Sequence, residues 1–290
     1  MWSFRTSTDM SIVEPEFVTI IRANVYSALS EDMGNGDLTA QLVPENTLGH
    51  ATVITRQHAV ICGKSWFDMC FKVLDPNCTV TWFVRDGSKA APNEKLCELH
   101  GNARALLTGE RAALNFLQTL SATATLTHEF VEAIKGFQAK IMDTRKTIPS
   151  LRLAQKYAVK IGGGHNHRMG LFDGMLIKEN HIAAAGGISE ALKQAFILAP
   201  EGATVQIEVE NMDELSEALD AGAKLILLDN FKLEGMKEAV KFTARRAELE
   251  ASGGINIETV RSIAETGIDR ISIGALTKNI SAVDLSMRFV

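Results

Sequence analysis

Four short apolar runs in the second half of the chain each end in a cluster of residues able to bind or transfer charge. The clusters are Asp143-Thr144-Arg145-Lys146, Lys178-Glu179-Asn180-His181, Glu208-Val209-Glu210-Asn211 and Leu228-Asp229-Asn230. In parallel α/β folds, catalytic groups gather at the carboxyl ends of the strands. The series therefore predicts one active site assembled from several loops.

Positive charge is concentrated around these clusters, although the chain as a whole has a net charge of −5. That net charge argues against a general nucleic-acid surface. Between residues 145 and 178 there are seven Lys or Arg against one acid, Asp173. Three of the seven lie four residues apart, as on the solvated face of one helix: Arg152, Lys156 and Lys160. The other four flank strand ends or a glycine loop, where a cation suits an anionic ligand: Arg145, Lys146, Arg168 and Lys178.

Two acidic side chains close neighbouring predicted strands. Glu208 and Asp229 follow consecutive apolar runs, so their carboxylates can approach one another and hold Mg²⁺ directly or through water. Alternatively, both acids form salt bridges with nearby lysines, and the two interpretations can each hold in part. Glu210 is the weaker candidate because it lies nearer the start of the following helix.

A glycine loop, Gly162-Gly163-Gly164-His165-Asn166-His167-Arg168, separates a predicted helix from a predicted strand. Its backbone amides and Arg168 can approach an anion closely. The loop lacks the Lys-Ser/Thr ending of a Walker loop. His165, His167 and His181 offer three zinc ligands, but no frame such as HExxH accompanies them, so we favour a polar or substrate-contacting loop over a metal site.

The last two predicted strands end in small residues suited to phosphate. Ser252-Gly253-Gly254 follows one strand and Gly274 the other. In βα barrels, glycine amides and a helix amino terminus at this position commonly bind phosphate. A Ser-Gly-Gly sequence alone is also an ordinary turn. Together with the cations and the acids, these residues indicate phosphoryl-sugar chemistry with an anionic acceptor.

The elements that must position these groups differ between the two halves of the chain. Residues 1–120 do not repeat a strand-helix unit: helical spacing runs over 15–32 and 64–74, and strand patterns over 51–56, 78–84 and 95–100. This mixture predicts an amino-terminal α+β sandwich domain with an antiparallel sheet. A helical stretch rich in Ala and Leu, 103–134, follows as the link between domains.

From residue 121 to 278 strands and helices alternate. Strands are expected near 140–143, 175–178, 205–209, 224–229, 247–251 and 270–274. The alternation predicts an α/β fold, an open or incomplete βα (TIM-like) barrel, because six strands are visible where a full barrel has eight. We expect residues 279–290 to form a carboxyl-terminal helix that joins the amino-terminal domain.

Length and composition fit a soluble enzyme. The 290 residues are 46% apolar and 22% charged, and no apolar run approaches the roughly 20 residues of a membrane helix. The segment 1–12 lacks the layout of a signal peptide, so a cytoplasmic location is expected. Four cysteines without metal-site spacing are expected to be free thiols: Cys62, Cys70, Cys78 and Cys97.

Several long motifs, in the same order along the chain, resemble those of the quinolinate phosphoribosyltransferases, the carboxylating nicotinate-nucleotide pyrophosphorylases. They are Gly109-Glu-Arg-Ala-Ala-Leu-Asn-Phe-Leu-Gln118, Asp143-Thr-Arg-Lys-Thr-Ile-Pro-Ser-Leu-Arg152, Gly162-Gly-Gly-His-Asn-His-Arg168, Leu176-Ile-Lys-Glu-Asn-His181, Glu208-Val-Glu-Asn211 and Leu228-Asp-Asn230. The resemblance covers nearly the whole chain. Departures from common family residues, at Ala122, Ile148 and Ser150, remove no charged site residue.

The resemblance implies phosphoribosyl transfer from phosphoribosyl pyrophosphate to quinolinate with decarboxylation, giving nicotinate mononucleotide, pyrophosphate and carbon dioxide in NAD synthesis. It implies Mg²⁺ as cofactor, held by Glu208 and Asp229, and a homodimer in which Arg111 enters the partner's pocket. The residues expected to be catalytic are Lys146, Lys178, Glu208 and Asp229. Those expected to bind quinolinate are Arg111, Thr144, Arg145, Lys146, His167, Arg168 and Lys178. Those expected to bind phosphoribosyl pyrophosphate are Glu208, Asp229, Ser252, Gly253, Gly254 and Gly274.

Two alternative functions fit the same fold, and a different sequence feature argues against each. A paralogue of the same fold, such as the relative associated with molybdenum transport, would act on another anion; the arginines at 111, 145 and 168 favour a dicarboxylate instead. A barrel that binds phosphorylated sugars without turnover would have no need of Glu208 and Asp229 beside the cations, since it stabilises no leaving pyrophosphate.

Overall fold

The computed structural model describes residues 15–290, and the segment 1–12 discussed above lies outside the described residues. Two compact units are present. The barrel unit contains residues 127–147 and 163–279; the amino-terminal unit contains the described residues up to 126, together with 148–162 and 280–290. The predicted boundary at residue 121 lies inside one long helix, α3 (Ala103–Ala133), whose last residues belong to the barrel unit.

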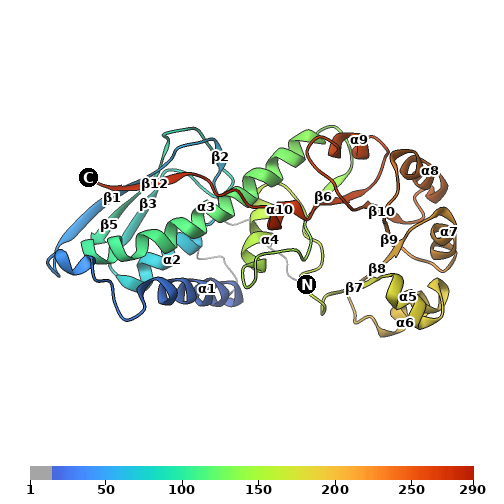
Figure 1. Ribbon diagram of the computed structural model, residues 1–290, viewed down its shortest axis with the longest axis horizontal. Coiled ribbons are helices and arrows are strands. Elements are labelled where there is room, and N and C mark those ends of the chain that lie inside the picture. Colours follow the sequence, from blue (N-terminus) through green and yellow to red (C-terminus); the bar gives the residue numbers. More distant parts are fainter. Residues whose placement is uncertain (1–14) are drawn as a thin grey trace. The chain divides into compact units, whose positions relative to one another are not determined.

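The barrel unit is built on a six-stranded parallel sheet in the order β6-β11-β10-β9-β8-β7 (Figure 1). Its strands are β6 (Lys140–Met142), β7 (Gly174–Ile177), β8 (Thr204–Val209), β9 (Leu225–Leu228), β10 (Glu248–Ala251) and β11 (Arg270–Ser272). Its helices are α5 (Glu179–Ala185), α6 (Ile188–Leu198), α7 (Met212–Asp220), α8 (Leu233–Thr243), α9 (Val260–Ala264) and α10 (Ala275–Lys278). All six predicted strands are confirmed. The sheet is open in this order, because β6 and β7 are its two edges and are not paired with each other.

Local sequence signals account for the regular alternation in this unit. The side chain of Asn211 caps α7 by accepting a hydrogen bond from the Glu214 backbone N–H at 2.9 Å, and such a cap satisfies a donor left open at the helix start. The run Leu225–Leu228 is almost wholly buried, as expected for a parallel strand covered on both faces. The helix cap and the buried strand determine where the strands end, and the charged clusters begin at those ends.

The amino-terminal unit has a four-stranded antiparallel sheet in the order β12-β1-β5-β3. Its strands are β1 (Leu48–Thr55), β3 (Thr79–Trp82), β5 (Lys95–Asn102) and β12 (Leu285–Phe289), with a short pair formed by β2 (Ala59–Val60) and β4 (Lys89–Ala90). Its helices are α1 (Pro15–Met33), α2 (Lys64–Leu74), α4 (Arg152–Ile161) and the first part of α3, with a 3-10 turn at Ala40–Leu42. The predicted α+β layer is confirmed.

The core of this unit lies between the sheet and its helices. Trp66, Phe67 and Phe71 of α2 are fully buried, and the rings of Phe67 and Phe71 meet edge to face at 5.1 Å between centroids, a favoured aromatic geometry. All four cysteines are buried free thiols, as predicted. No helix within residues 15–290 is long and apolar enough to cross a membrane.

The predicted carboxyl-terminal helix is wrong. Residues 285–289 form β12, which pairs antiparallel with β1 and buries Met287 against the core. Strand formation prevails because the edge of β1 offers unpaired backbone groups along its whole length, which a short helix could not satisfy. The expected attachment of this segment to the amino-terminal unit is nevertheless present.

One buried carboxylate predicts a pH-dependent stability. Burial raises the pKa of Asp68 to about 6, although the hydrogen bond from the Trp82 indole N–H (2.8 Å) and the charge of Lys64 act the other way. The pKa of the folded state exceeds the ordinary value of 3.8, so Asp68 lowers stability progressively as the pH rises from about 4 to about 6, and the full cost persists above that window.

Asp68→Asn keeps an acceptor for Trp82 and removes the charge. We expect it to raise the free energy of unfolding at pH 7.5 by roughly 2–3 kcal/mol, and to have little effect at pH 4. Equilibrium unfolding at the two pH values measures this difference. The matched control is Asp32→Asn, an exposed carboxylate of the same unit. An equal gain at both pH values would rule out the titration as its cause.

Candidate active site

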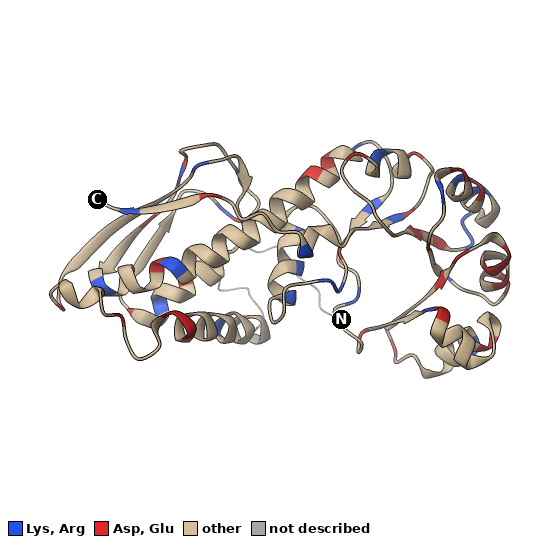
Figure 2. Cartoon of the chain, in the orientation of Figure 1, with Lys and Arg blue, Asp and Glu red and all other residues tan. Residues whose placement is uncertain are grey.

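The charged clusters converge at the carboxyl end of the parallel sheet. A Cβ added at Gly274, after β11, would lie 3.0 Å from the Lys146 Cδ and 3.7 Å from the Thr144 Oγ1, both after β6. A Cβ added at Gly253, after β10, would lie 3.9 Å from the Asp229 Oδ1, after β9. Thus four of the loops meet pairwise at this end of the sheet, as the sequence predicted. Figure 2 marks the acidic and basic residues along the chain.

Lys178 and Glu208 form a salt bridge across neighbouring strands. The Lys178 Nζ lies 2.7 Å from the Glu208 Oε2. The carboxylate is 13% exposed and the lysine 48% exposed. The pair therefore faces solvent at the carboxyl end of the sheet rather than the interior. This is the lysine–acid alternative considered above. It does not exclude a ligand role, because the lysine is exposed enough to move toward an arriving anion.

Two guanidinium groups lie close together on the loops after β6 and before β7. Burial lowers the pKa of Arg168, and the nearby positive charge of Arg145 lowers it further. The Arg168 Nη1 donates a hydrogen bond to the carbonyl of Gly174 at 3.0 Å, which fixes the direction of its side chain. The charge of Asp173 acts the other way on the pKa of Arg168. A bound anion reduces the repulsion between two neighbouring guanidinium groups.

Asp143, a fully buried acid at the end of β6, anchors the glycine loop. Its Oδ1 accepts the backbone N–H of His167 at 2.8 Å, and its Oδ2 accepts a side-chain N–H of Asn166 at 2.6 Å. A carboxylate with several N–H donors is a strong anchor. The loop that carries Arg168 is thereby attached to the end of the sheet.

A directional chain of hydrogen bonds runs from this loop into the barrel. The Arg168 backbone N–H donates to the His167 Nδ1 at 2.8 Å, the His167 Nε2 meets the Gln206 Oε1 at 2.8 Å, and the Gln206 Nε2 donates to the Glu250 Oε2 at 3.0 Å. A backbone N–H can only donate, so Nδ1 is the acceptor and the proton resides on Nε2. In this arrangement His167 is neutral and both ring nitrogens are used within the protein.

Sequence reasoning did not identify Gln206 and Glu250. They are 3% and 1% exposed, in the middle of β8 and near the end of β10. The available signal was a polar residue inside a short, otherwise apolar strand, which a buried parallel strand rarely contains without a partner. The Glu250 Oε1 is buried and has no hydrogen-bond partner in the described part of the chain.

The acidic side chains at the carboxyl end of the sheet offer a set of oxygen atoms that can bind a metal ion. Burial, and then the negative charges of Glu179, Glu214, Asp229 and Glu208, raise the pKa of Glu210. Crowded carboxylates of this kind are the ligands that Mg²⁺ prefers. Glu208 and Asp229 fit such an ion chemically, and their role as its ligands stays a prediction. The Asp229 Oδ2 meanwhile accepts a hydrogen bond from the Asn230 amide at 3.0 Å.

The glycines after β10 leave an open turn. Gly253 and Gly254 have φ values of +100° and +60°, a region that strongly favours glycine. A Cβ added at Gly254 would meet nothing within 4 Å. Exposed backbone amides next to open space suit a phosphate, so Ser252, Gly253 and Gly254 stay candidates for that role.

The remaining predicted residues lie in distinct settings. The His181 Nδ1 accepts the backbone N–H of Lys178 at 3.0 Å and so caps α5. His165, His167 and His181, which the sequence disfavoured as a zinc site, do not bring three ligand atoms together among the described residues. Arg111 is exposed on α3 in the amino-terminal unit, and its entry into a partner's pocket stays a prediction.

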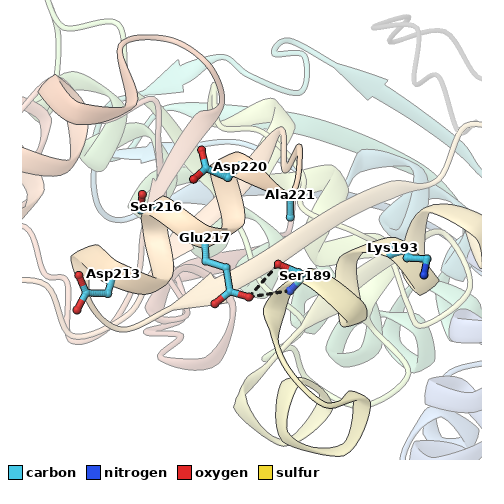
Figure 3. Close-up of a pocket in the computed structure, with 7 residues that line it drawn as sticks. All are labelled: Ser189, Lys193, Asp213, Ser216, Glu217, Asp220 and Ala221. Atoms are coloured by element: carbon cyan, nitrogen blue, oxygen red, sulfur yellow. Dashed lines mark hydrogen bonds between the residues drawn. The ribbon is translucent and has the colours of Figure 1, made fainter.

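A depression of about 670 Å³ lies away from the strand ends, between α6 and α7 (Figure 3). The Glu217 carboxylate on one wall accepts hydrogen bonds from the backbone N–H and the hydroxyl of Ser189 at 3.1 and 2.9 Å. Its other lining groups include Asp213, Asp220 and Lys193. These exposed groups on the outer helices, of which Glu217 and Ser189 are hydrogen-bonded to each other, do not indicate a reaction site.

Comparisons with known proteins agree with one another over most of the chain. The model of the quinolinate phosphoribosyl transferase N-terminal domain matches residues 37–121, and that of the C-terminal domain matches residues 123–288. A Bacillus subtilis protein named probable nicotinate-nucleotide pyrophosphorylase [carboxylating] is 42% identical over 257 residues, 89% of each chain. A Mycobacterium leprae protein of the corresponding name is 40% identical over 276 residues, 92% of this chain and 96% of its own. A solved nicotinate-nucleotide pyrophosphorylase structure from Francisella tularensis is 45% identical, with a TM-score of 0.92 over 98% of this chain and 100% of its own.

Proposed function

Because the chain belongs to the quinolinate phosphoribosyl transferase family, we propose that it transfers the phosphoribosyl group of phosphoribosyl pyrophosphate to quinolinate. The products are nicotinate mononucleotide, pyrophosphate and carbon dioxide, and the reaction supplies NAD synthesis. The observation that supports this acceptor best is the proximity of Arg145 and Arg168, where one positive charge disfavours the other. A planar dicarboxylate relieves that repulsion through paired hydrogen bonds.

The first bond change occurs at the ribose carbon that carries pyrophosphate. The bond from that carbon to the pyrophosphate oxygen breaks, and the quinolinate ring nitrogen forms a new bond to the same carbon. Positive charge develops on the ribose ring and negative charge on the leaving group. Fixed charges of the protein stabilise both developing charges. Glu208 and Asp229 face the developing cation on the ribose ring. Lys146 and Lys178 meet oxygens of pyrophosphate or substrate.

The second change is the loss of carbon dioxide. The alkylated ring nitrogen carries a positive charge, which stabilises the electron pair left on the adjacent ring carbon when the carbon–carboxylate bond breaks. That carbon then takes up a proton. The protein's part is to hold the second carboxylate by the arginines while the first is lost as carbon dioxide. Because the electron pair and the proton are accounted for in this way, the step requires no organic cofactor.

Mg²⁺, a homodimer and a cytoplasmic location belong to the same proposal. Mg²⁺ held by Glu208 and Asp229 would neutralise charge on the departing pyrophosphate. The crowded carboxylates around Glu210 support that assignment. In the dimer, Arg111 of one subunit would complete the quinolinate pocket of the other, which is compatible with its exposure on α3.

The test is product release by the purified protein with phosphoribosyl pyrophosphate and Mg²⁺, supplied in parallel with quinolinate or nicotinate. We expect carbon dioxide and pyrophosphate in equal amounts with quinolinate only, because nicotinate lacks the carboxylate that is lost. Absence of turnover from folded protein that still binds phosphoribosyl pyrophosphate would overturn the proposal in favour of a paralogue or a sensor. Turnover with nicotinate alone would reassign the acceptor.

A further inference from the structure

Three potential metal ligands meet on the solvent-facing side of the amino-terminal sheet, which belongs to a different compact unit from the strand-end clusters. His50 on β1 is directly opposite His100 on β5, and Glu98 is two residues along the same strand. Residues two apart on a strand face the same side. The opposite side of the sheet is the buried one, where Ala51, Cys97 and Leu99 lie.

The ligand atoms of this cluster are close to one another. One ring nitrogen of each histidine and a carboxylate oxygen of Glu98 lie within 4.8 Å of one another. The His50 Nε2 lies 3.9 Å from the Glu98 Oε2. The imidazole rings stack with 4.1 Å between centroids and an interplanar angle of 13°. The other Glu98 oxygen, Oε1, is held by Lys95 at 2.7 Å, so the carboxylate is already fixed with Oε2 toward the histidines.

The His50 Nε2 is a buried polar atom that has no hydrogen-bond partner among residues 15–290. The side chain as a whole is 34% exposed, so the ring nitrogen is covered even though the residue is not. A covered, unpaired nitrogen is unfavourable unless something binds it. Neutral imidazole and carboxylate are ligands of borderline divalent ions such as Zn²⁺, whereas Mg²⁺ prefers oxygen ligands alone.

We propose that His50, His100 and Glu98 form a binding site for Zn²⁺ or a similar transition-metal ion on the exposed face of the amino-terminal sheet, with water as the fourth ligand. Zn²⁺ takes nitrogen and oxygen ligands at about 2.0–2.2 Å, so the three atoms must draw closer together than 4.8 Å. Rotation of each imidazole about its Cβ–Cγ bond supplies that movement and turns the stacked planes toward a common point. The bound ion would link β1 to β5.

The experiment is a Zn²⁺ titration of the full chain at pH 7.5, where histidine is largely neutral, with excess Mg²⁺ present to occupy the all-oxygen sites. The variant is His100→Ala, an exposed position, and the control is His58→Ala, an exposed histidine of the same unit outside the cluster. We expect one Zn²⁺ equivalent in the parent and in the control. In His100→Ala its affinity falls at least about 10-fold, the loss typical even of a ligand's supporting partners. Equal binding by the parent and His100→Ala overturns the proposal.

Two further readouts separate ligation from a packing defect. X-ray absorption of the Zn²⁺ form is expected to show two imidazole nitrogens, and one or none would contradict the site. Zn²⁺ is also expected to raise the unfolding midpoint of the parent and of His58→Ala, but not of His100→Ala, because a ligand stabilises only the folded state that binds it. A His100→Ala protein with the parent's midpoint in the absence of Zn²⁺ establishes that the variant is folded.

Discussion

Lys146→Ala is expected to lower kcat about 10²–10³-fold without loss of assembly. Lys146 follows β6, its stem lies over Gly274, and its ammonium group is exposed and makes no ion pair with the described residues. Such a charge is available to the departing pyrophosphate or to a substrate oxygen. Removal of one preorganised stabilising group costs roughly 2.7–4 kcal/mol of transition-state energy.

The measurement is steady-state kinetics with both substrates varied, together with the molecular mass in solution. Lys237→Ala on α8 is the matched control: it removes an exposed lysine of the same unit that pairs with Glu234 at 2.8 Å. Its turnover should equal that of the parent. Lys146→Arg retains the charge and is expected to recover part of the activity. Unchanged turnover in Lys146→Ala would remove this residue from the catalytic set.

The strand ends were predictable because their chemistry is local. An apolar run followed by a charged cluster indicates where a buried parallel strand stops, and four of the six strands of the barrel unit were marked in this way. The last two end in small residues and were predicted from the alternation of strands and helices. Convergence of the clusters followed from the architecture, since carboxyl ends of parallel strands share one edge. The contact of Gly274 with Lys146 is a direct consequence.

The errors have a different cause. Residues 285–289 form a strand because β1 is available to pair with them, and this non-local partner leaves no mark in the segment itself. The same holds for Gln206 and Glu250, whose importance arises from hydrogen bonds between β8, β10 and the glycine loop. Single-sequence patterns do not encode which polar side chains will meet in a core. The pairing of His50 with His100 across neighbouring strands could not be predicted for the same reason.

The chain from Glu250 to His167 changes the role expected of that histidine. The sequence suggested His167 as one of the groups that bind quinolinate. Its Nε2–H is directed to Gln206, and its Nδ1 accepts the N–H of Arg168, so the ring neither carries a charge nor offers a nitrogen to substrate in this arrangement. We infer instead that it positions the backbone at Arg168, whose pKa the positive charge of Arg145 lowers.

Gln206→Leu is therefore expected to raise the KM for quinolinate about 10–100-fold, with a smaller effect on the KM for phosphoribosyl pyrophosphate. The substitution removes the middle of the chain: the partly buried His167 N–H loses its acceptor and the buried Glu250 carboxylate loses the Gln206 N–H. The His167 Nε2 and the Glu250 Oε2 are then 3.8 Å apart, beyond hydrogen-bond distance, so the loop that carries Arg168 is destabilised. Steady-state kinetics with each substrate varied in turn measure the two KM values separately. A purely structural defect would lower the active fraction and reduce kcat alone.

Glu250→Gln is the matched control, because a Gln206 N–H can still donate to its side-chain oxygen while the buried charge is removed. It should retain the parent's KM for quinolinate within a few-fold. The ¹⁵N shifts of His167 supply a readout independent of activity: the parent should show a proton on Nε2, and Glu250→Gln should preserve that tautomer. If Gln206→Leu binds quinolinate as the parent does, or if the proton resides on Nδ1, the hydrogen-bond chain does not position Arg168 and the arginine pair must be held by the Asp143 anchor alone.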